Sequence, residues 1–357
     1  MAANDGDPQA PPTPDEIAAL KRLVDGVIRA QGNRFIKELL RAKKIRIGDT
    51  KEDFTINLYG AIDTGKLRLD EVAEWLKSVE GWGNQHVYLY NISSTLRKDL
   101  TMTKIRQRVQ AQDDLEKVWS AATVLEFPDE PNLTSISFVG SVFRLVWQEA
   151  SPTWIQAPEK DYTTQEGLDT FQYRAWRKIE RRVITRFEAH LDKGLAALFI
   201  PAPINDCEHG TAIEEARRVI GLLMDVPALL RGQLDISVVS KNLDQQNLPN
   251  NRTPNPAVKT QKSRLTSGGA YVEFAATSTS KAFWEEQAVR NVRNSVRTPQ
   301  QLLAFKGTEG SFIFQEEVGL TRPLRVQLYG EGNRVRLWAQ MDADEVWTIL
   351  SKVDTYQ

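Results

Sequence analysis

The spacing of apolar side chains in the first eighty residues predicts four short helices. In the first, at about 14–30, apolar residues recur every three or four positions, as they do on the buried face of an amphipathic helix. These residues are Ile17, Leu20, Leu23, Val24 and Val27. Further helices are expected at about 33–44, at about 51–62, and from Asp70 to Gly81. Thr13 and Thr50 each precede a helix, with an acid three residues on, which is typical of a capping box.

The pattern changes along the rest of the chain. A short strand is expected at 86–90, followed by a helical connector at 94–119. After Ala121 we expect a β-rich segment at 134–147 and strands at 183–191, 195–200, 234–239, 271–276, 312–315, 324–329 and 334–340, with helices at 210–224, 280–296 and 342–353. Because these elements show no regular βαβ rhythm, the sequence predicts an α+β fold whose twisted sheet is mainly antiparallel.

This organisation predicts two domains. We expect a disordered tail at 1–13, rich in Pro, Ala and Asp, and then a small helical domain with its connector at 14–120. A larger α+β domain is expected at 121–357, with a long polar loop at 241–269. A loop of that length is too long for a passive connection.

Composition narrows the possible classes of protein. With 41% hydrophobic residues, 26% charged residues and a net charge of -1, the 357-residue chain is neither a uniformly basic coat nor a disordered polyelectrolyte. A single cysteine excludes an internal disulfide framework. No run of about 18 apolar residues is present and the N-terminal stretch lacks the features of a signal peptide, so we expect no membrane contact and a cytoplasmic location.

Positive charge is concentrated in the segment Phe35–Ile62, where one helix ends beside the start of the next. The cations are Lys37, Arg41, Lys43, Lys44, Arg46 and Lys51. Cations beside a helix N-terminus favour a phosphate, because the helix dipole and the free N–H groups add to the side-chain charge. The sequence therefore predicts a phosphate-binding junction between these two helices.

The same segment resembles a SAP-type helix–loop–helix module, a small DNA-binding unit. The resemblance covers about thirty residues, and the residues that carry it are Leu39, Leu40, Lys43, Lys44, Ile45, Gly48, Asp49, Thr50, Lys51 and Leu58. It implies a loop that holds an aliphatic residue, a turn that opens the second helix, and contact with DNA.

Two further basic clusters are present. The first surrounds Trp176 and contains Arg174, Arg177, Lys178, Arg181 and Arg182, where an arginine could stack on the ring or reach a phosphate. The second places Arg290 and Arg293 at helical spacing, with Lys259, Lys262 and Arg264 in the long loop. Each cluster is also compatible with an ordinary solvated surface. Three such clusters in a chain of net charge -1 imply segregated charge, which favours a polyanion as partner.

Catalytic patterns are weak. The histidines His86, His190 and His209 lack the spacing of a metal site, so we expect no metal, no cofactor and no assigned catalytic residue. No strand-borne Glu-x-Lys follows an acid, as many metal-dependent nucleases would require.

The sequence thus favours a non-enzymatic DNA-associated protein whose helical domain binds the phosphate backbone largely without sequence specificity, the β-rich domain acting as a scaffold. Two alternatives stay open. One is a protein–protein adaptor subunit of a multi-subunit assembly, and the other is a metal-dependent nuclease with scattered ligands.

Overall fold

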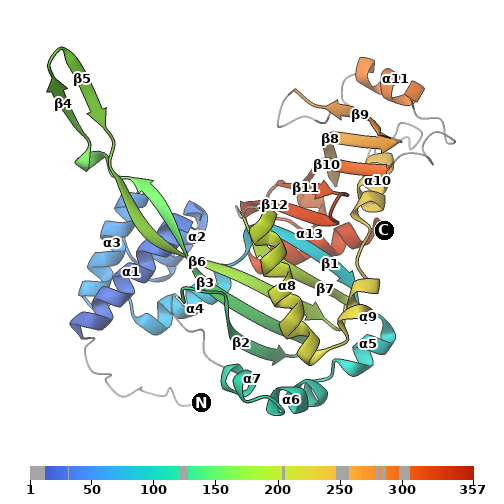
Figure 1. The fold of residues 1–357 in the computed structure, drawn as a ribbon, viewed down its shortest axis with the longest axis horizontal. Helices are drawn as coiled ribbons and strands as arrows, with labels where there is room; N and C mark the ends of the chain where they lie inside the picture. The colour runs from blue at the N-terminus through green and yellow to red at the C-terminus, as the bar shows by residue number, and fades with distance from the viewer. Residues whose placement is uncertain are drawn as a thin grey trace. The chain divides into compact units, whose positions relative to one another are not determined.

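The computed structural model describes residues 13–30, 32–120, 128–202, 206–246, 257–267, 269–277, 282, 287–296 and 306–357. They form N-terminal helices and a large, mainly antiparallel sheet, which confirms the α+β class (Figure 1). The helices are α1 (Pro14–Ala30), α2 (Asn33–Ala42), α3 (Lys51–Asp63), α4 (Leu69–Val79), α5 (Ser94–Asp99), α6 (Met102–Gln110), α7 (Asp113–Val118), α8 (Asp206–Leu223), α9 (Val226–Arg231), α10 (Ile236–Gln246), α11 (Gln287–Val296) and α13 (Ala343–Asp354). The strands are β1 (Gly83–Asn91), β2 (Asn132–Val139), β3 (Val142–Gln156), β4 (Tyr162–Glu166), β5 (Asp169–Tyr173), β6 (Trp176–His190), β7 (Leu195–Pro201), β8 (Val258–Ser267), β9 (Ala270–Ala275), β10 (Lys306–Phe314), β11 (Leu324–Tyr329) and β12 (Arg334–Gln340).

The chain divides into two compact units. The helical unit comprises residues 1–80, 123–132 and 148–183, and the sheet unit comprises residues 81–122, 133–147 and 184–357. The sequence predicts a first boundary near residue 120. In the structure the first boundary follows Glu80. The reason is β1, which pairs with β7 on one side and with β12 on the other and so belongs to the centre of the sheet.

The helical unit contains the four predicted N-terminal helices. The Thr13 backbone N–H donates to Glu16 Oε2 at 2.7 Å, and the Glu16 N–H donates to Thr13 Oγ1 at 3.3 Å, so the predicted cap of α1 is present. Thr50 and Asp53 form the same box at α3. Apolar side chains from all four helices make one core, in which Phe54 and Leu58 are fully buried. Burial of this apolar stripe supplies most of the stability of such short helices.

The ten-stranded sheet has the order β2-β3-β6-β7-β1-β12-β11-β10-β8-β9. The central strands are buried on both faces because apolar side chains point to both sides: Val87 and Leu89 of β1 join one core, whereas Tyr88 and Tyr90 join the other. The predicted hairpins at 183–200 and 324–340 are both present as β6–β7 and β11–β12.

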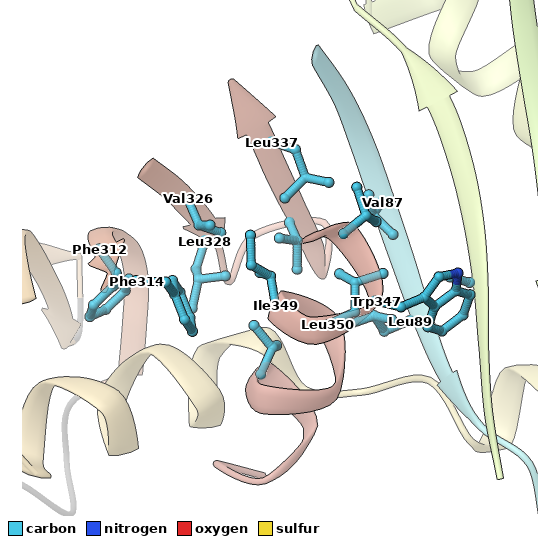
Figure 2. Close-up of a cluster of buried hydrophobic side chains, with 14 of the residues drawn as sticks. Val87, Leu89, Phe312, Phe314, Val326, Leu328, Leu337, Trp347, Ile349 and Leu350 are labelled. Atoms are coloured by element: carbon cyan, nitrogen blue, oxygen red, sulfur yellow. The ribbon is translucent and has the colours of Figure 1, made fainter. Parts of the chain in front are cut away.

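One core lies between the sheet and α13. Figure 2 shows side chains of α13 meeting residues of β1, β10, β11 and β12. The residues drawn and labelled are Val87, Leu89, Phe312, Phe314, Val326, Leu328, Leu337, Trp347, Ile349 and Leu350. The second core lies on the opposite face, where α5, α6, α7 and α8 supply apolar side chains to β2, β3, β6 and β7.

Two sequence predictions in the sheet unit are corrected by the structure. Residues 234–239 are not a strand but lead into α10, because the Asp235 carboxylate accepts hydrogen bonds from the Ser237 and Val238 N–H groups and starts the helix. The polar stretch 241–269 is not a loop throughout, since it contains the end of α10 and the strand β8. Residues 247–256 of that stretch lie outside the described residues, as do residues 1–12 of the expected disordered tail.

A two-stranded hairpin is the main feature that the sequence does not predict. Strands β4 and β5 form a sheet of their own, connected to the ends of β3 and β6, and Figure 1 shows them projecting as an arm. Most of their side chains are exposed. None of the described helices is long and apolar enough to cross a membrane.

Candidate nucleic-acid interface

The junction between α2 and α3 is a short loop fixed by one buried side chain. The Ile45 N–H donates to the Leu40 carbonyl at 2.8 Å, and the Ile45 side chain, only 8% exposed, packs in the core of the helical unit. Lys44, just before it, adopts a left-handed backbone conformation with φ of 52°. The loop thus holds Lys44 and Arg46 at the surface on either side of a fixed point.

The N-terminus of α3 is already occupied by a carboxylate of the chain itself. Asp53 Oδ2 accepts hydrogen bonds from the Asp49 and Thr50 N–H groups, each at 3.0 Å, while the Asp53 N–H donates to Thr50 Oγ1. The Thr50 and Asp49 N–H donors, with the Thr50 hydroxyl and the nearby Arg46 charge, hold the pKa of the Asp53 carboxyl below its usual range. An incoming phosphate would therefore contact side-chain cations at this junction. The sequence predicts a phosphate site that also uses free N–H groups of the helix, and in the structure Asp53 occupies these groups.

Two of the six predicted cations already have partners within the helical unit. Lys43 Nζ forms an ion pair with Glu71, and both side chains are about 30% exposed. Burial acts to raise the pKa of the Glu71 carboxyl, but the Lys43 ammonium and the Arg68 N–H outweigh it, so the net shift is downward. Lys37 lies over the Phe54 ring, with its ammonium 5.8 Å from the ring centroid. We therefore assign Lys43 and Lys37 mainly to the packing of the unit.

Four of the predicted cations remain at the surface of the junction: Arg41, Lys44, Arg46 and Lys51. No carboxylate among the described side chains is paired with Arg41 or Lys44. The structure adds a fifth cation that sequence reasoning missed. Lys66, after the end of α3, donates to the Lys44 carbonyl at 2.6 Å, so its charge lies at the same loop. We call these five residues the junction cations.

The cluster around Trp176 is only partly available. Arg174, Arg177 and Lys178 are exposed, whereas Arg182 is buried at 8% exposure and pairs with Glu80 at 3.3 Å. The side chain of Arg181 lies outside the described residues. Arg182 and Glu80 therefore form a structural ion pair within the helical unit, and Arg182 is not available for contact at the surface.

The third predicted cluster is weaker than the sequence implies. Arg290 and Arg293 lie on α11, but their side chains are outside the described residues. Lys262 and Arg264 lie on β8, where the strand register brings Glu273 of β9 and Glu309 of β10 beside them. Lys262 pairs with Glu309 at 3.0 Å and Arg264 with Glu273 at 2.6 Å, so these two cations are largely neutralised.

A buried carboxylate in the sheet unit is surrounded by cations and hydrogen-bond donors. Glu188 of β6 is fully buried; it accepts hydrogen bonds from Arg144 and from Trp347 Nε1, the latter at 3.0 Å. His190 Nε2 is 3.4 Å from Glu188 Oε2, and Arg186 Nε lies at 3.8 Å. Each lone pair therefore faces a donor or a cation, which is typical of a structural network.

Acid–base chemistry finds little support in the described residues. They contain no group of three or more His, Cys, Asp or Glu side chains placed to hold a metal ion. A surface hollow beside α13 is lined by Lys193, Asp344, Trp347, Ser351 and Lys352, among others, and Asp344 is its one carboxylate among the described lining residues. This arrangement gives neither a metal centre nor a carboxylate pair.

Exposed aromatic side chains on and beside the arm are the other surface feature, of which the sequence analysis singled out only Trp176. Trp154, Tyr162, Phe171, Tyr173 and Trp176 are between 42% and 61% exposed. Their signal in the sequence is the alternation of ring and polar residues on either side of Gly167 and Leu168. Comparison of the chain with known protein families and with curated proteins finds no match.

Proposed function

We propose that the protein binds the phosphate backbone of DNA through the junction cations of its helical unit, largely without sequence specificity and without catalysing a reaction. The observation that carries the proposal is the set of five cations around one short loop, Arg41, Lys44, Arg46, Lys51 and Lys66, of which Lys66 arrives from a different part of the fold. Long flexible cations at an exposed loop suit phosphate contacts, which set position and affinity rather than sequence. The proposal keeps the cytoplasmic location expected from the sequence.

The occupied N-terminus of α3 supports contact by side chains alone. Because Asp53 already accepts the N–H groups at that end, a bound phosphate would gain mainly Coulomb energy from lysine and arginine. Binding of this kind is strongly dependent on salt. With four or five phosphate contacts, the slope of log affinity against log salt is about -4, which means a loss of roughly 250-fold between about 50 and 200 mM salt.

Reversing two junction charges is expected to abolish most of the binding. The variant Lys44→Glu/Arg46→Glu should bind a labelled 20-base-pair duplex at least about tenfold more weakly at low salt, with a salt slope smaller by about 2. Fluorescence anisotropy at several salt concentrations measures both quantities. Urea unfolding verifies that the variant is folded, which we expect because both side chains are exposed.

The matched control changes net charge equally but elsewhere. Lys98→Glu/Lys117→Glu replaces two exposed lysines on α5 and α7 of the sheet unit. It should leave affinity within about twofold of the unchanged protein, since it removes none of the junction cations and their phosphate contacts remain. Absence of binding at low salt, or equal losses in the two variants, would refute the proposal. Recovery of a protein partner that survives nuclease treatment, with no DNA binding, would favour the adaptor alternative instead.

Removing the capping carboxylate is expected to strengthen binding. Asp53 is ionised at neutral pH, because its pKa lies below the usual range, and it faces the same loop as Arg46. Asp53→Asn removes one negative charge from the junction and should tighten duplex binding about threefold at low salt. Asp161→Asn in the arm, which also removes an exposed acid, should not reproduce the gain in duplex affinity. A weaker complex of folded Asp53→Asn would contradict this prediction.

A further inference from the structure

The arm formed by β4 and β5 exposes an unusual amount of aromatic surface. Among the described side chains of residues 154–176, six large apolar ones are exposed: Trp154, Tyr162, Leu168, Phe171, Tyr173 and Trp176. Leu168, at the turn, is fully exposed. A soluble chain seldom maintains such a surface on a projecting element unless something binds there.

Three of the rings, those of Tyr162, Phe171 and Tyr173, lie on one face of the β4–β5 hairpin. The register pairs Tyr162 with Tyr173 and Thr164 with Phe171, so these side chains point to the same side of the hairpin. The two tyrosine rings stack, with centroids 4.8 Å apart and planes 14° from parallel. The opposite face carries Thr163, Gln165, Thr170 and Gln172. The ring-bearing face also carries Thr164 and, next to the turn, Glu166 and Asp169, so its aromatic part lies toward β3 and β6 and its acids lie at the tip.

Cations lie at the end of the arm that joins β6. Arg174, Arg177 and Lys178 are exposed, and no carboxylate among the described side chains pairs with them. The nearby Asp161 is engaged with the backbone, because its Oδ1 accepts from the Ala175 N–H at 2.7 Å. Exposed rings next to unpaired cations are complementary to a ligand that has flat apolar groups on a chain of negative charges.

We infer that the arm binds single-stranded nucleic acid, its rings stacking on unpaired bases while Arg174, Arg177 and Lys178 hold the adjoining phosphates. Every base has a flat face, so such stacking is tolerant of sequence. A duplex offers these rings no unpaired base, and the arm therefore adds affinity for single strands only. A lipid surface fits less well, because Glu166 and Asp169 flank the turn and would enter it first. This inference rests on the proposed function, in that both take a nucleic acid as the partner.

The test compares four ligands with equal backbone charge per strand. Fluorescence anisotropy is measured with dT20, with a 20-residue abasic strand, and with the 20-base-pair duplex; rU20 is included to distinguish RNA from DNA. The unchanged full-length protein should bind dT20 or rU20 roughly 5- to 100-fold more tightly than the abasic strand, and the tighter of the two identifies the sugar. Equal affinity for dT20, rU20 and the abasic strand would overturn the inference.

Variants assign the effect to the arm. Phe171→Ala/Trp176→Ala should weaken single-strand binding roughly tenfold or more and leave duplex binding unchanged, while Trp176→Phe, which keeps a ring, should restore part of the loss relative to Trp176→Ala. The matched control Tyr271→Ala removes an exposed ring of β9 and should change neither affinity. Circular dichroism checks the fold of each variant, and the exposure of these rings predicts little change.

The failures of the two proposals are distinguishable. If the arm variants bind dT20 and rU20 as the unchanged protein does, while Lys44→Glu/Arg46→Glu loses duplex binding, the arm inference fails and the proposed function stands. If no nucleic acid binds at low salt, both fail. If sedimentation shows a dimer that the arm variants convert to a monomer, with nucleic-acid binding unchanged, the arm is an interface between copies and the inference is overturned.

Discussion

Replacing Glu188 by glutamine is expected to lower the free energy of unfolding of the sheet unit by about 3 to 5 kcal/mol. The side chain keeps its size, so no cavity forms, and the loss is electrostatic. Arg186, with its side chain 6% exposed, would remain in the interior 3.8 Å from a neutral amide instead of a carboxylate. Arg144, which now donates to the same oxygen, would lose its counter-ion as well. A buried charge left without its partner costs far more than an exposed one.

Urea unfolding at neutral pH, followed by tryptophan fluorescence, measures this effect. The control is Glu215→Gln, which removes the carboxylate of a surface ion pair with Arg218 on α8. The free energy of unfolding of this control should change by less than about 0.5 kcal/mol. If the two glutamine variants are equally stable, the Glu188 network does not stabilise the fold.

The same network predicts a dependence on pH. Burial acts to raise the pKa of the Glu188 carboxyl, but the His190 hydrogen bond and the Arg186 and Arg144 guanidinium groups outweigh it and lower the pKa to about 2, from 4.5. Since the folded pKa lies below the unfolded one, ionised Glu188 stabilises the fold fully above about pH 4.5, and this contribution is lost as the pH falls toward 2. The loss amounts to about 3 kcal/mol. Glu188→Gln should therefore unfold with a weaker dependence on pH in this range.

Local signals in the sequence predicted local structure well. The caps at Thr13 and Thr50 depend on residues three positions away, and the hairpin at 324–340 depends on its own turn, so both are visible in a short window. The run Leu234–Val239 shows the limit of this reasoning. Its apolar side chains fit a buried helix as well as a strand, and the Asp235 cap decides for the helix.

The sequence does not reveal which strands and which charged side chains pair when they lie far apart along the chain. Strand β8 is polar along much of its length, yet it is a strand because β9 and β10 pair with it and place Glu273 and Glu309 beside its cations. Lys43 is likewise neutralised by Glu71 of α4, 28 positions along the chain. In both cases a cation that looks available in the sequence has a partner supplied by tertiary structure. Lys66 is the opposite case, a cation that the fold adds to the junction. The chain turns back after the end of α3, and Lys66 Nζ donates to the Lys44 carbonyl.

The surface exposure of individual cations is therefore the feature that the sequence predicts least well. The junction retains most of its predicted cations at the surface because Ile45 is buried between them and fixes the loop. The cluster at Trp176 divides along β6, where Lys178 near the start of the strand is exposed while Arg182, further along, is buried beside Glu80. Only the fold determines which member of a charge cluster meets solvent.

Substituting alanine at Gly83 is expected to destabilise the sheet unit by about 4 kcal/mol or more, because two penalties add. Gly83 opens β1 opposite Gln340 with φ of +72°, a left-handed conformation that costs a residue with a Cβ about 1 to 2 kcal/mol. The added Cβ would also lie 2.1 Å from the Ala339 carbonyl oxygen and 2.6 Å from the Met341 nitrogen. Both contacts are with backbone atoms of β12 and its exit, so relief requires the two strands to separate.

The control for this substitution isolates the steric part. Gly140, in the β2–β3 turn, has φ of +60°, but a Cβ built there meets nothing within 4 Å. Gly140→Ala should therefore cost only the conformational penalty of about 1 kcal/mol. Urea unfolding of the two variants gives the difference directly, and we expect Gly83→Ala to be the less stable by about 3 kcal/mol. Equal stabilities would mean that β1 and β12 separate at this point without cost, and that the pairing there contributes little to the sheet.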